Sequence, residues 1–171
     1  MEKLSQLLTD RCHEIACAKK WKSVSKIVGE AMEDCVITLP CPFCHETSLA
    51  KYKTNQKSKD VLCGKCGCEI QIKATKHTKN ARTTIKLLGA EYRTTLSSVK
   101  ENNVHYLVLL YSTKDGKYTI RDICLIHHDD ITESCIIPRK PLSSAAKRAG
   151  WQGCMLVFSN FESVNLDDCY A

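Results

Sequence analysis

The sequence has 171 residues, which suits one domain and is too short for two ordinary cores. Hydrophobic residues make up 43% and charged residues 26%, a balance that excludes a disordered chain. No apolar run approaches the roughly 18 residues of a membrane span, and the N-terminus lacks the apolar segment of a secretory signal. We therefore expect no membrane partner, while the net charge of +6 permits a polyanionic one.

The first half of the chain predicts two helices and two strands, with a cysteine-rich segment between the strands. Residues 1–20 and 23–34 carry apolar side chains at three- and four-residue steps, the period of a helix. Residues 35–39 form an apolar run that Pro40 ends, which is typical of a short strand. Residues 69–75 alternate between polar and apolar side chains, as a half-buried strand does.

The second half predicts a long helix, a β-hairpin, a short helix and a final strand. Thr83 or Thr84 can cap the long helix, and Lys114–Lys117 contains the Asp-Gly pair favoured in hairpin turns. The predicted elements are a helix at 83–102, strands at 104–111 and 118–126, a helix at 143–149 and a strand at 154–158. This alternation predicts a single α/β domain over residues 1–171, with an insertion at residues 41–68.

Four of the twelve cysteines form two Cys-x-x-Cys pairs. Cys41 and Cys44 make the first pair, and Cys63 and Cys66 make the second. Each pair places two thiolates on one tight turn, and Gly67 gives the second turn backbone freedom. Two such turns facing each other complete the tetrahedral four-sulfur shell that a structural Zn²⁺ prefers. The insertion is therefore predicted to be a zinc ribbon.

The remaining thiols leave alternatives open. His45 and Cys68 adjoin the two pairs, and either can replace one thiolate. The other cysteines show no pairing pattern and are expected to be small buried apolar residues: Cys12, Cys17, Cys35, Cys124, Cys135, Cys154 and Cys169. Free thiols without a secretory signal indicate a reducing, intracellular location, the cytoplasm of a bacterium or, for a eukaryotic or viral source, also the nucleus.

A group of polar residues adjoins the second cysteine pair. Glu69, Gln71 and Lys73 alternate with apolar residues and so share one face of the predicted strand. If the ribbon folds back on itself, Asp60 reaches that face from a neighbouring strand. Carboxylate and amide oxygens beside a lysine can bind Mg²⁺ and hold an attacking water. The alternative is a solvated polar face without a ligand.

Basic residues flank this group. No acid occurs between Ile70 and Ala90, where the cations are Lys73, Lys76, Lys79, Arg82 and Lys86. The ribbon adds Lys51, Lys53, Lys57 and Lys59. Such a distribution favours a phosphodiester partner, double-stranded DNA. An ordinary solvated basic loop is the alternative.

Two stretches resemble one protein family. The run Asp60–Cys66 followed by Glu69–Lys73 resembles the split PD-(D/E)XK motif of the DpnI-type restriction endonucleases, the Dam-replacing family. In that family a four-cysteine zinc knuckle also separates the catalytic Asp from the strand that bears the lysine. Pro138–Leu142 and Ala146–Cys154 resemble the family signature RKPL…ARRAGWxGC nearly residue for residue. The resemblance covers about residues 20–160.

The resemblance implies a fold, an activity and residue roles. The fold would be the mixed sheet flanked by helices of PD-(D/E)XK restriction endonucleases, with the zinc ribbon inserted. The activity would be hydrolysis of DNA at a short site, directed by adenine methylation. Asp60, Gln71 and the carbonyl of Ile72 would bind Mg²⁺, or Mn²⁺ in its place. Lys73 would orient the attacking water and help to deprotonate it.

The sequence departs from the family pattern in two places. Gln71 stands where the family has its catalytic Glu, and an amide oxygen binds Mg²⁺ more weakly than a carboxylate. Glu69, one step back on the same strand face, is the alternative second ligand. The chain also stops before the winged helix that reads adenine methylation, so we expect no C-terminal winged helix. Recognition would then fall to this domain, to a homodimer or to a separate methyl-reading partner.

The signature stretch adds candidate DNA contacts. Its cations can clamp phosphates, and Trp151 can stack or wedge against a base or else fill a buried corner. The predicted DNA-binding set is Lys76, Lys79, Arg82, Arg139, Lys140, Lys147, Arg148 and Trp151.

The sequence thus supports three functions. The first is a Mg²⁺-dependent type II restriction-like deoxyribonuclease with a structural zinc. The second is a catalytically silent DNA-binding module on a nuclease fold. The reason to retain this alternative is Gln71, which replaces the catalytic Glu of the family. A zinc-ribbon interaction protein without DNA is the third, and the basic runs count against it.

Overall fold

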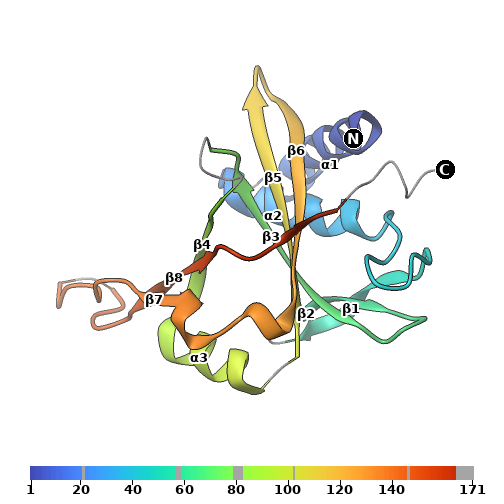
Figure 1. Ribbon diagram of the computed structural model, residues 1–171. Coiled ribbons are helices and arrows are strands. Elements are labelled where there is room, and N and C mark those ends of the chain that lie inside the picture. Colours follow the sequence, from blue (N-terminus) through green and yellow to red (C-terminus); the bar gives the residue numbers. More distant parts are fainter. Residues whose placement is uncertain (21, 57–58, 79–82, 102, 146, 165–171) are drawn as a thin grey trace.

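Figure 1 shows the computed structural model of the chain, which describes residues 1–20, 22–56, 59–78, 83–101, 103–145 and 147–164. The N-terminal helices α1 (Glu2–Lys19) and α2 (Val24–Val36) pack against each other and against one face of a sheet. Their buried side chains recur at helical spacing. None of the helices in the described part of the chain is long and apolar enough to cross a membrane.

The larger sheet is mixed and has six strands in the order β1-β2-β3-β5-β6-β9. Strands β3 and β5 are parallel, and the other neighbouring pairs are antiparallel. The strands are β1 (Leu49–Gln56), β2 (Lys59–Cys63), β3 (Glu69–Lys76), β5 (His105–Lys114), β6 (Lys117–Ile126) and β9 (Glu162–Ser163). The Asp115-Gly116 turn, with both φ angles positive, joins β5 to β6.

A smaller sheet and a third helix cover the other face of β5 and β6. The sheet has the order β4-β8-β7, and both its neighbouring pairs are antiparallel. Its strands are β4 (Ile85–Glu91), β7 (Ile136–Pro138) and β8 (Gly153–Phe158). Helix α3 (Tyr92–Glu101) follows β4, and two short 3₁₀ helices, η1 (His128–Asp130) and η2 (Glu133–Cys135), lead from β6 to β7 (Figure 1). The fold is therefore mixed α/β.

The two faces of the larger sheet belong to two separate apolar clusters. Ile70 and Ile72 of β3 join the cluster beneath α1 and α2. Gln71 and Lys73 alternate with them and pair in register with Tyr106 and Val108 of β5, which belong to the other cluster. The alternation predicted for residues 69–75 thus directs the polar residues of β3 toward the side of α3 and the smaller sheet.

Most of the predicted elements are confirmed with small shifts of their ends. They are the first two helices, the strands at 69–75, 104–111, 118–126 and 154–158, and the hairpin turn. The strand predicted at 35–39 is wrong, because Cys35 and Val36 complete the buried face of α2 and a turn follows. The helix predicted at 143–149 is also wrong: the described residues there form turns.

The helix predicted at 83–102 is wrong in its first half. Ile85 and Leu87 are buried while Lys86 and Leu88 are exposed, which is the period of a strand. This segment is β4, paired with β8, and the helix begins only at Tyr92. The Leu88 side chain, expected on the inner face of a helix, is 66% exposed.

Candidate functional site

The two Cys-x-x-Cys pairs form matching turns. The carbonyl of Cys41 accepts a hydrogen bond from the N–H of His45, and the carbonyl of Cys63 accepts one from Gly67. His45 and Gly67 both have positive φ, 59° and 74°, which closes each turn in the same way. His45 therefore corresponds to Gly67, and Glu46 corresponds to Cys68. The two alternative zinc ligands, His45 and Cys68, thus follow the last cysteine of their turns.

The four thiols of the two turns converge on one point. The Sγ atoms of Cys41, Cys44, Cys63 and Cys66 all lie within 4.8 Å of one another. Cys41 Sγ is 3.7 Å from Cys66 Sγ, and Cys44 Sγ is 3.6 Å from Cys63 Sγ. Tetrahedral Zn²⁺ with Zn–S bonds of about 2.3 Å requires S–S separations of about 3.8 Å. The donor set therefore fits zinc, and these four cysteines can hold it.

The pKa values of the cluster thiols shift in opposite directions: burial raises the pKa of Cys41, whereas Cys63 is favoured as a thiolate. Burial opposes ionisation of Cys63, but hydrogen bonds from the backbone of Cys66, the Ser48 hydroxyl and the backbone of Lys65 outweigh it and lower its pKa to about 5. Cys68 Sγ lies 3.4 Å from Cys41 Sγ beside the cluster.

The cysteines outside the two pairs are only partly as expected. Cys12, Cys35, Cys124 and Cys154 are buried, as predicted, and Cys135 is half-buried. Cys17 is exposed on α1, contrary to that expectation, because it lies on the outer face of the helix. Cys169 lies outside the described residues.

The hairpin of β1 and β2 brings Asp60 to the edge of β3. The Asp60 Oδ2 atom accepts a hydrogen bond of 2.8 Å from the backbone N–H of Ile72. This bond fixes the carboxylate beside the segment that carries Gln71 and Lys73. A carboxylate has about four acceptor positions on its two oxygens, so Asp60 retains capacity for a further ligand.

The half-buried side chain of Lys73 interacts with charges of opposite sign. Burial lowers the pKa of its ammonium, and the negative charges of Asp60 and then Glu33 oppose that shift. The cation thus interacts with two carboxylates that come from different elements, β2 and α2. Asp60 and Lys73 are brought together as the strand pattern predicted.

Glu69, by contrast, is held by neighbours on β1 and β2. Its Oε1 accepts a hydrogen bond of 2.6 Å from the Tyr52 hydroxyl, and its Oε2 lies 2.5 Å from the Lys59 ammonium. The bonds from Lys59 and Tyr52 lower the pKa of Glu69. Lys59 and Lys51 both form ion pairs within the domain, so the charges of these two ribbon lysines are balanced by acids of the same chain.

Glu33 is a neighbour of the site that the sequence did not reveal. It lies on α2, with its Oε2 3.3 Å from the Lys51 ammonium. Burial raises the pKa of Glu33, the charge of Lys51 lowers it, and the charge of Asp60 raises it again. The effect of Asp60 on Glu33 indicates that the two carboxylates are close enough to interact. Only the packing of α2 on the sheet brings Glu33 there, so no local spacing could predict it.

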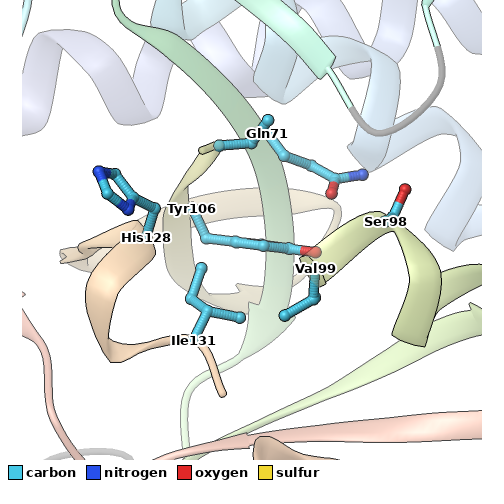
Figure 2. Close-up of a pocket in the computed structure, with 7 residues that line it drawn as sticks. Gln71, Ser98, Val99, Tyr106, His128 and Ile131 are labelled. Atoms are coloured by element: carbon cyan, nitrogen blue, oxygen red, sulfur yellow. The ribbon is translucent and has the colours of Figure 1, made fainter. Parts of the chain in front are cut away.

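Gln71 points into a small pocket between β5 and α3 (Figure 2). Ser98 and Tyr106 contribute hydroxyls to the lining, and both residues are buried, at 6% exposure. Burial raises the pKa of Tyr106 to about 12, so its hydroxyl stays protonated. The pocket leaves about 10 Å³ of free space, the room of about one water. The full lining is Gln71, Ser98, Val99, Val104, Tyr106, His128 and Ile131.

A cluster of aromatic rings connects this pocket to the first cysteine turn. Phe43, between Cys41 and Cys44, packs on His105 with ring centroids 4.2 Å apart. His105 contacts His128, which lines the pocket, at 4.8 Å, and accepts the backbone N–H of His128 on Nδ1. Burial, followed by the nearby His128 and His127, lowers the pKa of His105 to about 4.

The predicted DNA-binding residues are mostly on the surface. Lys76 lines a hollow of about 300 Å³ together with Lys86 and four threonines. Lys79 and Arg82 lie outside the described residues. The signature cations are exposed: Arg139, Lys140, Lys147 and Arg148.

Trp151 is half-buried, and its surroundings explain the glycines of the signature. The Arg148 guanidinium lies 4.5 Å from the centroid of the Trp151 ring, an arrangement that favours cation–π attraction. A Cβ atom on Gly153 would come within 2.9 Å of the ring. Gly150 has φ of 74°, which only glycine adopts readily. The Trp151 ring therefore packs on the Gly153 backbone at a corner, with part of its surface open.

The chain matches a protein-family model. The family model DpnI, described as the Dam-replacing family, matches residues 11–165. The match spans α1 to β9 and so includes the four-cysteine cluster, the Asp60–Lys73 pair and the signature loop. The chain belongs to the DpnI, or Dam-replacing, family.

Proposed function

We propose that the protein is a Mg²⁺-dependent DNA endonuclease of the PD-(D/E)XK type, with one domain over residues 1–171 and a structural zinc ribbon at residues 41–68. The family is associated with restriction-type nuclease activity on methylated DNA. The observation that carries the proposal is the bond from the Ile72 N–H to Asp60, which sets a carboxylate beside Gln71 and Lys73. That constellation is the donor set expected of a metal-dependent nuclease.

The residues near Asp60 suit a hard divalent cation. Asp60, the amide oxygen of Gln71 and the carbonyl of Ile72 are oxygen donors from two adjacent strands, and Mg²⁺ prefers oxygen. Glu33 adds negative charge to the surroundings of Asp60 and Lys73, although its own ion pair is with Lys51. Glu69 already forms an ion pair with Lys59 and accepts a hydrogen bond from Tyr52, so we assign it a structural role.

Each residue then has a defined task in hydrolysis. When bound, Mg²⁺ would supply the positive charge that stabilises the developing negative charge on the phosphoryl oxygens. Asp60, held by the Ile72 N–H, provides a fixed carboxylate that needs no reorganisation. Lys73, half-buried and attracted by that carboxylate, donates hydrogen bonds that orient the attacking water toward phosphorus.

Duplex DNA would contact the basic loop at residues 139–152 and the hollow at Lys76 and Lys86. The loop presents four exposed cations, and the hollow combines cations with hydroxyl donors, both of which suit phosphate oxygens. In the described part of the chain the cysteines are free, in keeping with a reducing intracellular location.

The second candidate is a silent DNA-binding module, and Gln71 is the residue that favours it. A plasmid-cleavage assay separates the two functions. The protein, loaded with zinc, is incubated with supercoiled plasmid in Mg²⁺ or Mn²⁺, using adenine-methylated and unmethylated DNA. Nicked or linear product from either DNA supports the nuclease. Binding without product under all four conditions would leave only the binding module.

A further inference from the structure

The four-cysteine cluster has a fifth thiol beside it. Cys68 Sγ lies 3.4 Å from Cys41 Sγ, which is closer than the 3.7 Å between Cys41 Sγ and Cys66 Sγ. The Cys68 thiol also interacts with that of Cys66. Two ligands of one tetrahedral Zn²⁺ are about 3.8 Å apart. Cys68 therefore lies at ligand distance from one side of the cluster.

Cys68 is nevertheless not part of the converging group. The four Sγ atoms that lie within 4.8 Å of one another are those of Cys41, Cys44, Cys63 and Cys66. A structural Zn²⁺ has four coordination positions, and these four thiols fill them. Cys68 can therefore bind the ion only when one of the four leaves its position.

Cys66 is the ligand most open to replacement. Cys41 and Cys63 are buried and Cys44 is half-buried, whereas Cys66 is exposed. An exposed thiolate is accessible to alkylating electrophiles, which convert it into a thioether that binds zinc poorly. Cys68 is half-buried and so better shielded from the same reagents.

Backbone hydrogen bonds hold Cys68 beside the cluster without the help of Cys66. The carbonyl of Cys68 accepts a hydrogen bond of 3.0 Å from the N–H of Cys63, and the carbonyl of Cys63 accepts one from Gly67. Cys63 is itself a member of the converging group. Cys68 thus stays next to the cluster when the bond from Cys66 to the metal is lost.

We propose that Cys68 is a reserve zinc ligand, which takes the coordination position of Cys66 when an electrophile modifies Cys66 or a substitution removes it. In the exchange the Cys68 thiol gives its proton to water, and its sulfur forms the Zn–S bond that Cys66 has lost. The ion keeps four thiolates, and the ribbon keeps its fold. The inference rests on the zinc ribbon of the proposed function and does not depend on cleavage of DNA.

Substitutions test the exchange, with Co²⁺ as a spectroscopic substitute for zinc. Each thiolate bound to Co²⁺ adds charge-transfer absorption, so the spectrum counts the thiolates. Cys66→Ser should keep four thiolates and bind zinc within about tenfold of the natural affinity, whereas Cys66→Ser combined with Cys68→Ser should lose one thiolate and about 10²-fold or more in zinc affinity. Cys68→Ser alone should match the natural chain. Cys44→Ser is the comparison and should lose one thiolate although Cys68 is present.

Alkylation tests the same exchange in protein that has already folded around zinc. Iodoacetamide forms a bond from the thiolate sulfur to carbon while iodide leaves. In the natural chain, mass spectrometry should find Cys66 modified while a colorimetric chelator detects no released zinc. In Cys68→Ser about one zinc should be released for each Cys66 modified.

The outcomes separate this inference from the rest of the account. A Cys66→Ser protein that loses one thiolate, or takes up no metal, would overturn the reserve role. So would four thiolates in the double variant or in Cys44→Ser. If the natural chain binds neither Zn²⁺ nor Co²⁺, the zinc ribbon fails and the reserve role fails with it, whereas the nuclease proposal is decided separately by the plasmid assay.

Discussion

At the scale of single residues, the three carboxylates around β3 differ in their partners. Asp60 is bonded to a backbone N–H and is free to serve a further ligand, whereas Glu69 is occupied by Tyr52 and Lys59. We expect Asp60→Ala to reduce cleavage by roughly 10²-fold or more, because it removes the fixed metal-binding charge. Glu69→Ala should cost only a few-fold. Comparable losses from the two changes, measured as initial cleavage rates, would assign Glu69 to the metal.

Glu33 was missed because nothing in its local sequence distinguishes it. It lies next to Asp34 in the acidic last part of an ordinary amphipathic helix, and its closeness to the site depends on how α2 packs. Asp60, Gln71 and Lys73 could be predicted because a strand's period of two and one hairpin were sufficient to bring them together. Residue positions that depend on local geometry were therefore predictable, and those that depend on helix packing were not.

His105 makes the stability of the domain depend on pH. Its pKa in the folded protein is about 4, below the ordinary value of 6.5. As the pH falls, the unfolded chain therefore binds the proton before the folded protein does. The contribution of His105 to the free energy of unfolding is complete above pH 6.5 and is lost as the pH falls toward 4. Because His105 is partly exposed, the loss should stay below about 1 kcal/mol per pH unit.

Denaturant unfolding of the zinc-loaded protein at pH 7 and pH 5 tests this expectation. The natural chain should lose more free energy of unfolding over this interval than His105→Asn, which has no proton to gain. Zinc release at low pH affects both proteins alike, so the difference between them isolates His105. Equal losses in the two proteins would show that His105 does not contribute.

At the scale of elements, the four-cysteine cluster and the proposed metal site share strand β2. Cys63 ends β2, the strand that carries Asp60, and Phe43 of the first turn packs on the histidines beside the Gln71 pocket. Binding of zinc to a four-cysteine site contributes about 10–16 kcal/mol in small peptides, which rivals the stability of a whole domain. Loss of zinc should therefore displace Asp60 as well as unfold the ribbon.

We expect Cys63→Ser to abolish both solubility and cleavage. Cys17→Ser is the matched control, because Cys17 is exposed on α1 and lies outside the four-cysteine cluster. Metal analysis of the purified proteins should find about one zinc per chain in the control. A Cys63→Ser protein that stays folded, lacks zinc and cuts DNA at the natural rate would contradict this account of the ribbon.

The elements that the sequence misassigned have a common physical cause. Ile85, Leu88, Tyr92 and Leu96 fit a helical period, but the β4 segment pairs with β8, and tertiary pairing overrides local preference. Residues 143–149 have helix-forming alanines, yet the loop is closed by hydrogen bonds from Leu142 and Gly150 across its base. In the smaller sheet, therefore, β4 was predicted as part of a helix, β7 was not predicted, and only β8 was predicted as a strand.

At the scale of the whole molecule, the exposed cations predict salt-dependent binding to duplex DNA. If five or six of them contact phosphates, log K should fall with log salt with a slope of about −4 to −5. Removing Arg139, Lys140, Lys147 and Arg148 together should flatten the slope by about 3 to 4. Lys114→Ala with Lys117→Ala, at the exposed β5–β6 turn, is the control. Binding that is indifferent to salt would favour an interaction partner other than nucleic acid.

The central claim is that the Asp60–Lys73 site hydrolyses DNA, and Lys73→Ala tests it most directly. Cleavage of a methylated duplex in Mg²⁺ or Mn²⁺ and DNA affinity by fluorescence anisotropy are measured on the same preparations, with Lys114→Ala, an exposed lysine at the β5–β6 turn, as the control. The account predicts that the natural chain and the control cleave, and that Lys73→Ala loses roughly 10²- to 10⁴-fold in rate with DNA affinity unchanged within a few-fold. Cleavage by Lys73→Ala at the natural rate, or no cleavage by the natural chain with either metal, would contradict it.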